Sequence, residues 1–387
     1  MKKLFILLLF FSISLSSNDN IVVVISMDGV RHDFPQLSQM GGFEYIQAEG
    51  LSASSLVPVY QSTTFPSHVS MATGVTPDKH GILHNSFYDV NRGTYSYSPD
   101  ASWIESEPVW AILERNNIKT ATYFWVGSET DWNGTQITYS KSPFDGEISE
   151  KIKIKQILEW IDLEQNLRPR LIMSWWQGTD TISHKKGSSD PEIVDQLKKQ
   201  DKLLLQLIRE ISDRNIWNKV TLLVVSDHGI SDISNYINLK KVLNKNSIDA
   251  RLSVGPAVAH IFLENLNEIE TTKRLLKKEA GLSVWKKTNL PSEYNMIHEH
   301  RTGDLIVTTE APNMIVNWNS SNPPKGMHGY NPKLNKEMEG IFFALGKGVS
   351  NLNIKSVHQL DIAPTILSLL NIKVPDYMSG NVIELNE

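Results

Sequence analysis

The chain has 387 residues, of which 40% are hydrophobic and 21% are charged, as in an ordinary soluble globular protein. Its formal net charge is -5 and it has no run of Lys or Arg, which argues against polymeric nucleic acid as a partner, because such binding depends on clustered basic side chains. The absence of cysteine excludes disulfides, thiolate metal ligands and a cysteine nucleophile. A chain of this length can be stabilised by its buried core alone.

Residues 1–17, MKKLFILLLFFSISLSS, have the pattern of a secretory signal peptide. Lys2 and Lys3 form the charged start, and a short apolar run and small residues follow. The rival interpretation is an uncleaved anchor, but the apolar run is shorter than the roughly 20 residues that a spanning helix needs. We therefore expect a secreted or periplasmic protein without a stable membrane anchor.

Beyond the signal, predicted strands and helices alternate along the chain. Runs of apolar and β-branched residues predict buried strands at residues 21–27, 120–125, 171–176, 220–226 and 341–345. Helical spacing of apolar residues predicts helices at residues 43–49, 64–74, 107–116, 148–163, 191–212 and 360–370. This alternation predicts an α/β fold, with a doubly wound, mostly parallel central sheet and helices on both of its faces.

Residues 230–325 show weaker patterns than the rest of the chain. Short helices around 239–243 and 268–279 alternate there with short strands at 257–263 and 304–308. We interpret this segment as a small α+β insertion packed on the sheet, so that residues 18–387 form a single domain.

The stretch at residues 62–85, STTFPSHVSMATGVTPDKHGILHN, places Thr64 at the start of a predicted helix. Pro66 suits the first turn of that helix and Gly74 suits its end. Unpaired backbone N–H groups and the positive end of the helix dipole make such a start a docking point for an anion such as phosphate. Taken alone, Thr64 is more simply explained as a helix cap.

Acidic residues follow three of the predicted strands. Asp28 and Asp227 come directly after two of them, and Asp180 comes four residues after the strand that ends at Trp176. In open α/β sheets, ligands bind beyond the carboxyl ends of the strands. Three carboxylates gathered there would repel one another and lose hydration, so either some are protonated or a cation lies among them. A divalent metal ion is the simplest of these explanations.

Histidines fit the same site. Asp180 and His184 are spaced i, i+4, which places both on one face of a helical turn, and His328 lies in the glycine-flanked loop GMHGY. Each such residue alone has an ordinary explanation, and only the joint pattern indicates a metal site. The potential ligands, all with nitrogen or oxygen donors, are Asp28, Thr64, Asp180, His184, Asp227, His228 and His328. They suit zinc, or another divalent transition ion, and are too many for one tetrahedral ion but suit two.

In this order the motifs resemble the nucleotide pyrophosphatase/phosphodiesterase family of the alkaline phosphatase superfamily. The matching segments are SMDGVR around Asp28, TFPSH around Thr64, TGVTPDKHGILHN ending at Asn85, EPVW at 107–110, YFWVGSE at 123–129, the DxxxH of Asp180 and His184, VSDHGI around Asp227 and GMHGY around His328. They span residues 21–370 and correspond to the family's catalytic domain alone. One departure is Ser67, where many members have Asn.

The resemblance implies an alkaline phosphatase-like fold and two zinc ions. One ion would be held by Asp180, His184 and His328, and the other by Asp28, Thr64, Asp227 and His228. Thr64 would be the nucleophile that forms a phospho-threonine ester, since coordination to a dication lowers the pKa of a hydroxyl. Asn85 would donate to a non-bridging oxygen of the phosphate.

Two aromatic residues suggest what the substrate carries. Phe65, next to the nucleophile, and Tyr139, in the polar loop at 127–147, are expected to flank a flat base, whose stacking contributes about 1–3 kcal/mol. An equal alternative for Tyr139 is packing on the sheet. We expect cleavage of phosphodiester or phosphoanhydride bonds in small nucleotides, releasing nucleoside 5′-monophosphates. Lysophospholipid or choline-phosphate diesters, phosphate monoesters and the oligomeric state stay open.

Overall fold

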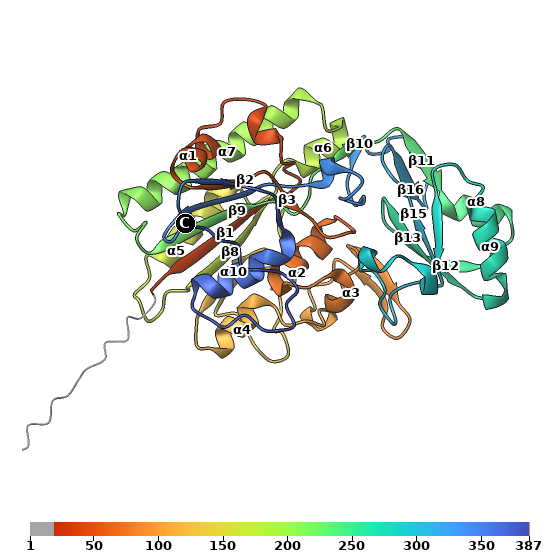
Figure 1. Cartoon of the computed structure of the whole chain (residues 1–387), viewed down its shortest axis with the longest axis horizontal. Coiled ribbons are helices and arrows are strands. Elements are labelled where there is room, and N and C mark those ends of the chain that lie inside the picture. The colour runs from red at the N-terminus through yellow and green to blue at the C-terminus, as the bar shows by residue number, and fades with distance from the viewer. Residues whose placement is uncertain (1–18, 387) are drawn as a thin grey trace, which may run out of the picture.

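The computed structural model describes residues 19–386, which are built around one eight-stranded sheet (Figure 1). From one edge to the other its strands are β19 (Leu352–Ile354), β2 (Leu51–Ala53), β18 (Phe342–Gly346), β9 (Val220–Val225), β1 (Ile21–Met27), β8 (Leu171–Trp176), β6 (Thr120–Tyr123) and β7 (Tyr139–Lys141). Neighbouring strands are parallel, except that β18 runs antiparallel to both β2 and β9. The predicted doubly wound, mostly parallel sheet is confirmed.

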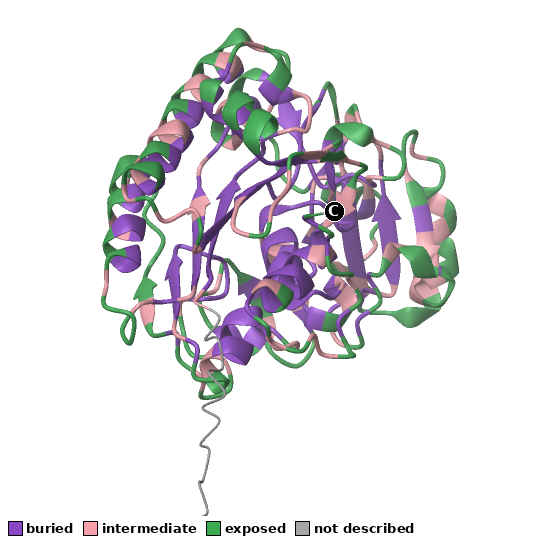
Figure 2. Ribbon diagram, turned by 60° about the vertical axis from the view of Figure 1, so that its left-hand side comes forward, coloured by how far each residue is buried: buried purple, intermediate pink, exposed green. Residues whose placement is uncertain are grey.

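The sheet is buried on both faces because helices cover each of them. Along β1, Val23 and Ile25 join one hydrophobic cluster, whereas Val22 and Val24 join the other, as the two-residue period of a strand requires. The helices over the first face are α1 (Gly41–Glu49), α5 (Glu150–Ile161) and α7 (Pro191–Asp213). Those over the second face are α2 (Thr64–Thr73), α4 (Val109–Arg115) and α10 (Ile362–Leu369). Figure 2 shows the strands buried and the outward sides of the covering helices exposed.

Helix α2 begins at Thr64 and ends before Gly74, whose φ of 68° is the left-handed conformation that glycine adopts without strain. The residue in the capping position is Thr63, not Thr64, and its side chain makes no capping hydrogen bond. The explanation of Thr64 as a simple helix cap is therefore wrong. The capping residue itself therefore satisfies none of the first N–H groups of α2 with its side chain, and the Thr64 hydroxyl is available for another role.

A second, antiparallel sheet lies within residues 230–325, where the sequence predicts an α+β insertion. Its strands are, in spatial order, β12 (Ala250–Val254), β13 (Val258–Leu263), β15 (Leu305–Thr308) and β14 (Ser283–Lys286). It packs with α8 (Leu239–Lys245) and α9 (Ile269–Leu276) around a hydrophobic cluster of its own (Figure 1).

Shorter elements complete the described fold. The two-stranded pairs are β10 (Ser231–Asp232) with β17 (Gly326–Met327), β11 (Asn235–Asn238) with β16 (Asn313–Val316), β3 (Leu56–Val57) with β20 (Val357–His358), and β4 (Ser86–Asp89) with β5 (Gly93–Ser96). The remaining α-helices are α3 (Pro77–His80) and α6 (Asp180–Lys186).

The predicted signal peptide, residues 1–17, lies outside the described residues. Within residues 19–386, no helix combines the length and the apolar character needed to cross a bilayer.

A buried arginine joins the segment of the second sheet to the β4–β5 hairpin. Arg301, only 1% exposed, donates from Nε to Asp89 at 2.9 Å and from Nη1 to the carbonyl of Trp103 at 3.0 Å. Its Nη2 lies 2.5 Å from a carboxylate oxygen of Glu105. Asp89 is itself only 2% exposed, so each charge depends on the other for compensation.

We expect Arg301→Met to lower the free energy of unfolding by about 3–5 kcal/mol, because it leaves the Asp89 carboxylate buried without its cation. Urea denaturation followed by circular dichroism measures this. The matched control is Arg115→Met, since the exposed guanidinium of Arg115 pairs with Glu107. This substitution should lower the free energy of unfolding by only about 0–1 kcal/mol. Equal losses in the two variants would contradict the structural role of Arg301.

Candidate metal and phosphoryl-transfer site

The carboxyl ends of three adjacent strands bring the predicted acids together. β1 lies between β8 and β9 and is parallel to both, so the three strands end at the same edge. Asp28 directly follows β1, Asp227 comes two residues after β9, and Asp180 begins α6 beyond β8. The β10–β17 pair then places His328 beside His228, with their rings stacked at a centroid distance of 3.6 Å.

Two groups of potential ligand atoms result, and they share one histidine. In the first group, His228 Nε2 lies 3.6 Å from Asp28 Oδ1 and 3.3 Å from Asp227 Oδ2. The second group consists of Asp180, His228 and His328, and within each group the ligand atoms lie within 4.8 Å of one another.

His184 extends the second group. Its Nε2 lies 3.0 Å from Asp180 Oδ1, and the same oxygen lies 3.7 Å from Nε2 of His328. The i, i+4 spacing on α6 thus places Asp180 and His184 side by side, as the helical period requires. All the metal-ligand candidates named from the sequence are brought to this edge of the sheet.

Backbone carbonyls set the tautomers of all three imidazoles. Nδ1 of His184, His228 and His328 lies 2.8–3.0 Å from the carbonyl oxygens of Gly326, Gly229 and Ser62, respectively. A carbonyl only accepts hydrogen bonds, so each Nδ1 carries the proton and each Nε2 presents its lone pair to the carboxylates. Such an arrangement is typical of metal-ligating histidines.

The carboxylates have the unmet bonding capacity that a cation would fill. Asp28 Oδ1, Asp180 Oδ1 and Asp227 Oδ2 are buried without a hydrogen-bond partner. Burial, together with the charges of Asp227 and Asp180, raises the pKa of Asp28 well above its usual range. The donor set and the orphaned oxygens fit divalent metal ions, because a dication placed among these groups offsets both the burial cost and the repulsion.

Histidines oppose the effect of burial at Asp180. Burial alone would raise the pKa of this carboxyl, but His184, followed by His328 and His228, lowers it. Burial would correspondingly lower the pKa of His184, and Asp180 raises it instead. Asp180 therefore stays ionised, as a metal ligand must be.

Thr64 and Asn85 lie together at the start of α2. Thr64 Oγ1 lies 3.4 Å from His228 Nε2, which puts the hydroxyl at the first ligand group. Asn85 Oδ1 accepts a hydrogen bond of 2.9 Å from the backbone N–H of Phe65, in the first turn of the helix. Because the amide oxygen of Asn85 is engaged there, its NH₂ group is the part left to donate to a ligand.

A cavity of about 560 Å³ opens from this cluster, and most of its exposed lining is apolar. It is lined by Thr64, Phe65, Asn85, Tyr97, Pro99, Val126, Glu129, Pro143, Phe144, Trp175, Asp180, His184 and His328. The residue Thr64, the acids Asp180 and Glu129 and several aromatic rings thus line the same cavity. The size and character of the cavity are those of a small-molecule binding site.

Tyr139 does not line this cavity, so its predicted pairing with Phe65 is corrected. It lies on edge strand β7, where its hydroxyl donates to the carbonyl of Leu167 at 2.9 Å and its ring packs near Trp160. Pairing of β7 with β6 fixes this orientation. Phe144, further along the same polar loop, is the aromatic residue at the cavity, where its ring stacks on Trp175 at 4.6 Å.

Sequence reasoning also missed Tyr97 and Glu129. The ring of Tyr97 meets that of Phe65 edge-on at 5.2 Å and is 61% exposed, so it stands at the mouth of the cavity. Glu129 ends the matched segment YFWVGSE, but no role was assigned to it. Burial raises the pKa of its carboxyl to about 7. Beyond its place in the matched segment no sequence signal singles it out, because the raised pKa depends on the folded structure.

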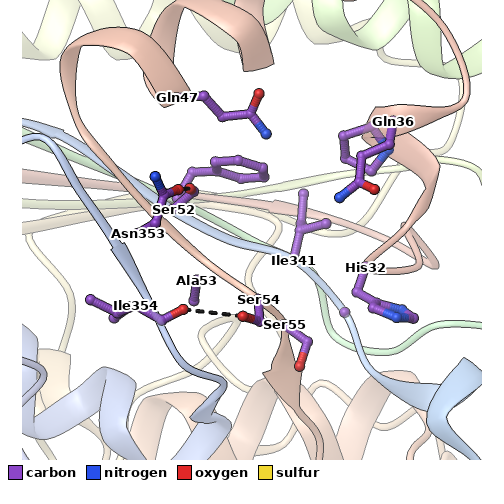
Figure 3. Close-up of a pocket in the computed structure, with 13 residues that line it drawn as sticks. His32, Gln36, Gln47, Ser52, Ala53, Ser54, Ser55, Ile341, Asn353 and Ile354 are labelled. Carbon is purple, nitrogen blue, oxygen red and sulfur yellow. Dashed lines mark hydrogen bonds between the residues drawn. The ribbon is translucent and has the colours of Figure 1, made fainter.

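A smaller polar hollow of about 160 Å³ lies near strands β2, β18 and β19 (Figure 3). Its lining includes His32, Gln36, Gln47, Ser52 and Asn353, and none of the residues that line it is acidic. Without a carboxylate it lacks the donors that a divalent ion needs, so the cavity at Thr64 is the functional candidate.

This fold and site define a hydrolase of the alkaline phosphatase-like α/β class, in which a hydroxyl lies at a cluster of acids and imidazoles. Comparison with known proteins assigns the family. The chain belongs to the type I phosphodiesterase/nucleotide pyrophosphatase family, whose sequence profile matches residues 22–331. The family is one of metalloenzymes.

Relatives show how far the likeness extends. An uncharacterised pyrophosphatase/phosphodiesterase of Schizosaccharomyces pombe is 27% identical over 87% of this chain and 73% of its own length. Venom phosphodiesterase 2 of Crotalus adamanteus is 28% identical over 91% of this chain, which spans only 45% of that enzyme. Murine ectonucleotide pyrophosphatase/phosphodiesterase 5, solved as an inactive variant with AMP, has a TM-score of 0.85 at 25% identity, covering 92% of this chain and 96% of that one.

The orphaned carboxylates predict that metal stabilises the fold. Zinc at about 100 times its dissociation constant should stabilise the chelator-treated protein by about 2.7 kcal/mol, because it binds the folded state. Thermal melting with and without zinc measures this shift. Asp227→Ala should reduce the shift strongly, and Asp376→Asn, at a fully exposed position, should leave it unchanged. A shift that is equal in both variants would place the metal elsewhere.

Proposed function

We propose that this protein is a phosphodiesterase and nucleotide pyrophosphatase that cleaves phosphodiester or phosphoanhydride bonds in small nucleotides and releases nucleoside 5′-monophosphates. The observation that carries the proposal is the position of the Thr64 hydroxyl, which lies at the start of α2, 3.4 Å from His228 Nε2, in a residue that lines an aromatic cavity. The family to which the chain belongs supports this reaction class.

Two divalent ions, with zinc favoured, are part of the proposal. Asp180, His184 and His328 would hold one ion, while Asp28, Thr64, Asp227 and His228 would hold the other. When bound, the ions would supply Lewis-acid stabilisation of the phosphoryl oxygens and would lower the pKa of the threonine hydroxyl. The all-nitrogen-and-oxygen donor set supports a transition ion such as zinc.

Thr64 would act as the nucleophile. Its hydroxyl would lose its proton as the oxygen attacks phosphorus, the bond from phosphorus to the leaving oxygen would break with a proton going to that oxygen, and a phospho-threonine ester would form. Water would then attack the same phosphorus, releasing the nucleoside monophosphate and returning a proton to the threonine oxygen. The positive end of the α2 dipole would favour the negative charge of the phosphate throughout. A murine relative that is inactive as a threonine-to-alanine variant is in keeping with this role.

Asn85 would stabilise the charge that develops on phosphate. Since its Oδ1 is held by the N–H of Phe65, its Nδ2 hydrogens are directed by the same contact and need no reorganisation as the reaction proceeds. It would therefore donate to a non-bridging oxygen of the phosphate.

The cavity favours a phosphate diester in which one of the two substituents on the phosphate carries a flat ring. Phe65, Tyr97 and Phe144 provide aromatic surface on which a base can stack, and AMP in the murine relative shows such a ligand in that protein. None of the lining residues is Lys or Arg, so the cavity offers no protein cation for the extra charge of a monoester. A phosphomonoesterase is therefore the weaker candidate. Lysophospholipid and choline-phosphate diesters are the alternative substrates.

Export from the cytoplasm is also part of the proposal. It rests on the pattern of residues 1–17 and on relatives that include venom phosphodiesterases and an ectonucleotide enzyme.

Thr64→Ala should lower kcat on bis-p-nitrophenyl phosphate by at least about 10³-fold, because no other group can form the covalent ester. The matched control is Thr63→Ala, which removes the neighbouring hydroxyl, one that has no hydrogen-bond partner, and should retain most of the activity. Steady-state kinetics at saturating zinc measures both. If Thr64→Ala keeps a tenth of the wild-type rate, Thr64 is not the nucleophile.

Phe144→Ala should raise KM for a nucleoside 5′-(p-nitrophenyl phosphate) about tenfold with little change in kcat, because one stacking surface is lost. Tyr45→Ala, which removes an exposed aromatic ring on α1, is the control and should change neither constant. An unchanged KM for Phe144→Ala would mean that the base does not bind in this cavity.

A further inference from the structure

Trp175 lies between the aromatic cavity and the ligand groups, and neither the motifs nor the proposed mechanism gives it a role. It lies near the end of β8 and pairs with Ser26 of β1, which precedes Asp28 by two residues. Its indole lines the cavity. It is the one described residue that stacks on Phe144 and also donates a hydrogen bond to Asp28.

The hydrogen bond sets the orientation of the Asp28 carboxylate. Nε1–H of Trp175 donates to Asp28 Oδ2 at 3.1 Å. The other oxygen, Oδ1, is buried without a hydrogen-bond partner and lies 3.6 Å from His228 Nε2. An indole N–H is a donor only, so it cannot compete for a cation and leaves one oxygen free to bind it.

The indole is itself held on several sides. The ring of Phe144 stacks on it with an interplanar angle of 25°, and the ring of His68 packs against it at 5.5 Å. Lys153, buried on α5, donates from Nζ to the backbone carbonyl of Trp175 at 2.9 Å. A donor fixed at both its ring and its backbone loses little conformational entropy when it orients a ligand.

We propose that Trp175 is a positioning residue for the cation bound by Asp28. Its indole N–H holds Oδ2, so that Oδ1 points into the first ligand group before any ion arrives. This inference rests on the metal site of the proposed function and does not depend on which substrate is cleaved. Partners that orient metal ligands in this way typically contribute 10- to 100-fold to metal affinity.

The test is calorimetric titration of zinc into the metal-stripped full chain, without substrate. Trp175→Phe keeps an aromatic ring and removes the N–H, so it should weaken one zinc site about 10- to 100-fold and leave the other within about twofold. Phe144→Leu removes the stacked ring but keeps the indole N–H, and Trp175 stays held by its strand register and by Lys153, so both affinities should stay within about twofold. Wild-type affinity in Trp175→Phe, or an equal loss at both sites, would overturn the proposal.

A double-mutant cycle separates positioning from packing. Asp28→Ala should abolish the same site, and adding Trp175→Phe to it should weaken the remaining site no further, because the two residues act on one ion. A weaker remaining zinc site in the double variant than in Asp28→Ala would contradict a role of Trp175 through Asp28. Circular dichroism and urea midpoints check that the variants fold, and Trp175→Leu, which keeps an apolar side chain and also lacks the indole N–H, replaces Trp175→Phe should that variant misfold.

Activity supplies an independent readout. Excess zinc should restore the kcat of Trp175→Phe to within a few-fold of wild type, because the defect is in ion affinity, whereas it should not restore the KM of Phe144→Leu. A rate defect in Trp175→Phe that zinc does not relieve would contradict the proposal. If the wild-type chain binds no zinc, the metal site of the proposed function fails, and with it this inference; if it binds zinc and Trp175→Phe binds it equally, only the inference fails.

Discussion

The electrostatic cost of burying acids at one sheet edge dominates this structure. Asp28, Asp180 and Asp227 come from three adjacent parallel strands and each has a carboxylate oxygen without a hydrogen-bond partner. Burial and mutual repulsion raise the pKa of Asp28, which shows how unfavourable the arrangement is without a counter-charge. Apolar side chains would avoid this cost, so the presence of three acids at the carboxyl edge points to cations that bind there.

The rest of the site adapts to that constraint. Backbone carbonyls hold the Nδ1 atoms of His184, His228 and His328, so that three Nε2 lone pairs face the acids. Helix α2 adds the Thr64 hydroxyl at its start, where the helix dipole favours an anion. The positive end of the helix and the ligand groups therefore lie at the same cavity.

The aromatic cavity and the ligand groups are one unit because a few residues belong to both. Trp175 lines the hollow and donates to Asp28, while Asn85 holds the start of α2 and lines the same hollow. The proposed substrate binding and ion binding thus share side chains. Substitutions in the wall of the cavity, such as at Phe144, are expected to alter substrate choice while the ligand groups stay the same.

The sequence alone predicted the central strands β1, β6, β8, β9 and β18, but not the outer strands β2, β7 and β19, and it named the candidate residues of the ligand groups. Runs of β-branched residues indicate buried strands. An acid directly after such a strand lies at the carboxyl edge of a parallel sheet, however the helices pack. Local periodicity also placed Asp180 and His184 on one helical face. The sequence could not decide which aromatic residue of the polar segment at 127–147 reaches the cavity. Tyr139 is held in β7 by pairing with β6, whereas Phe144 follows β7 and stacks on Trp175. The hydrogen bond from Trp175 to Asp28, the exposed position of Tyr97 and the buried pair of Arg301 with Asp89 likewise depend on contacts between residues far apart in the chain, which only tertiary packing brings together.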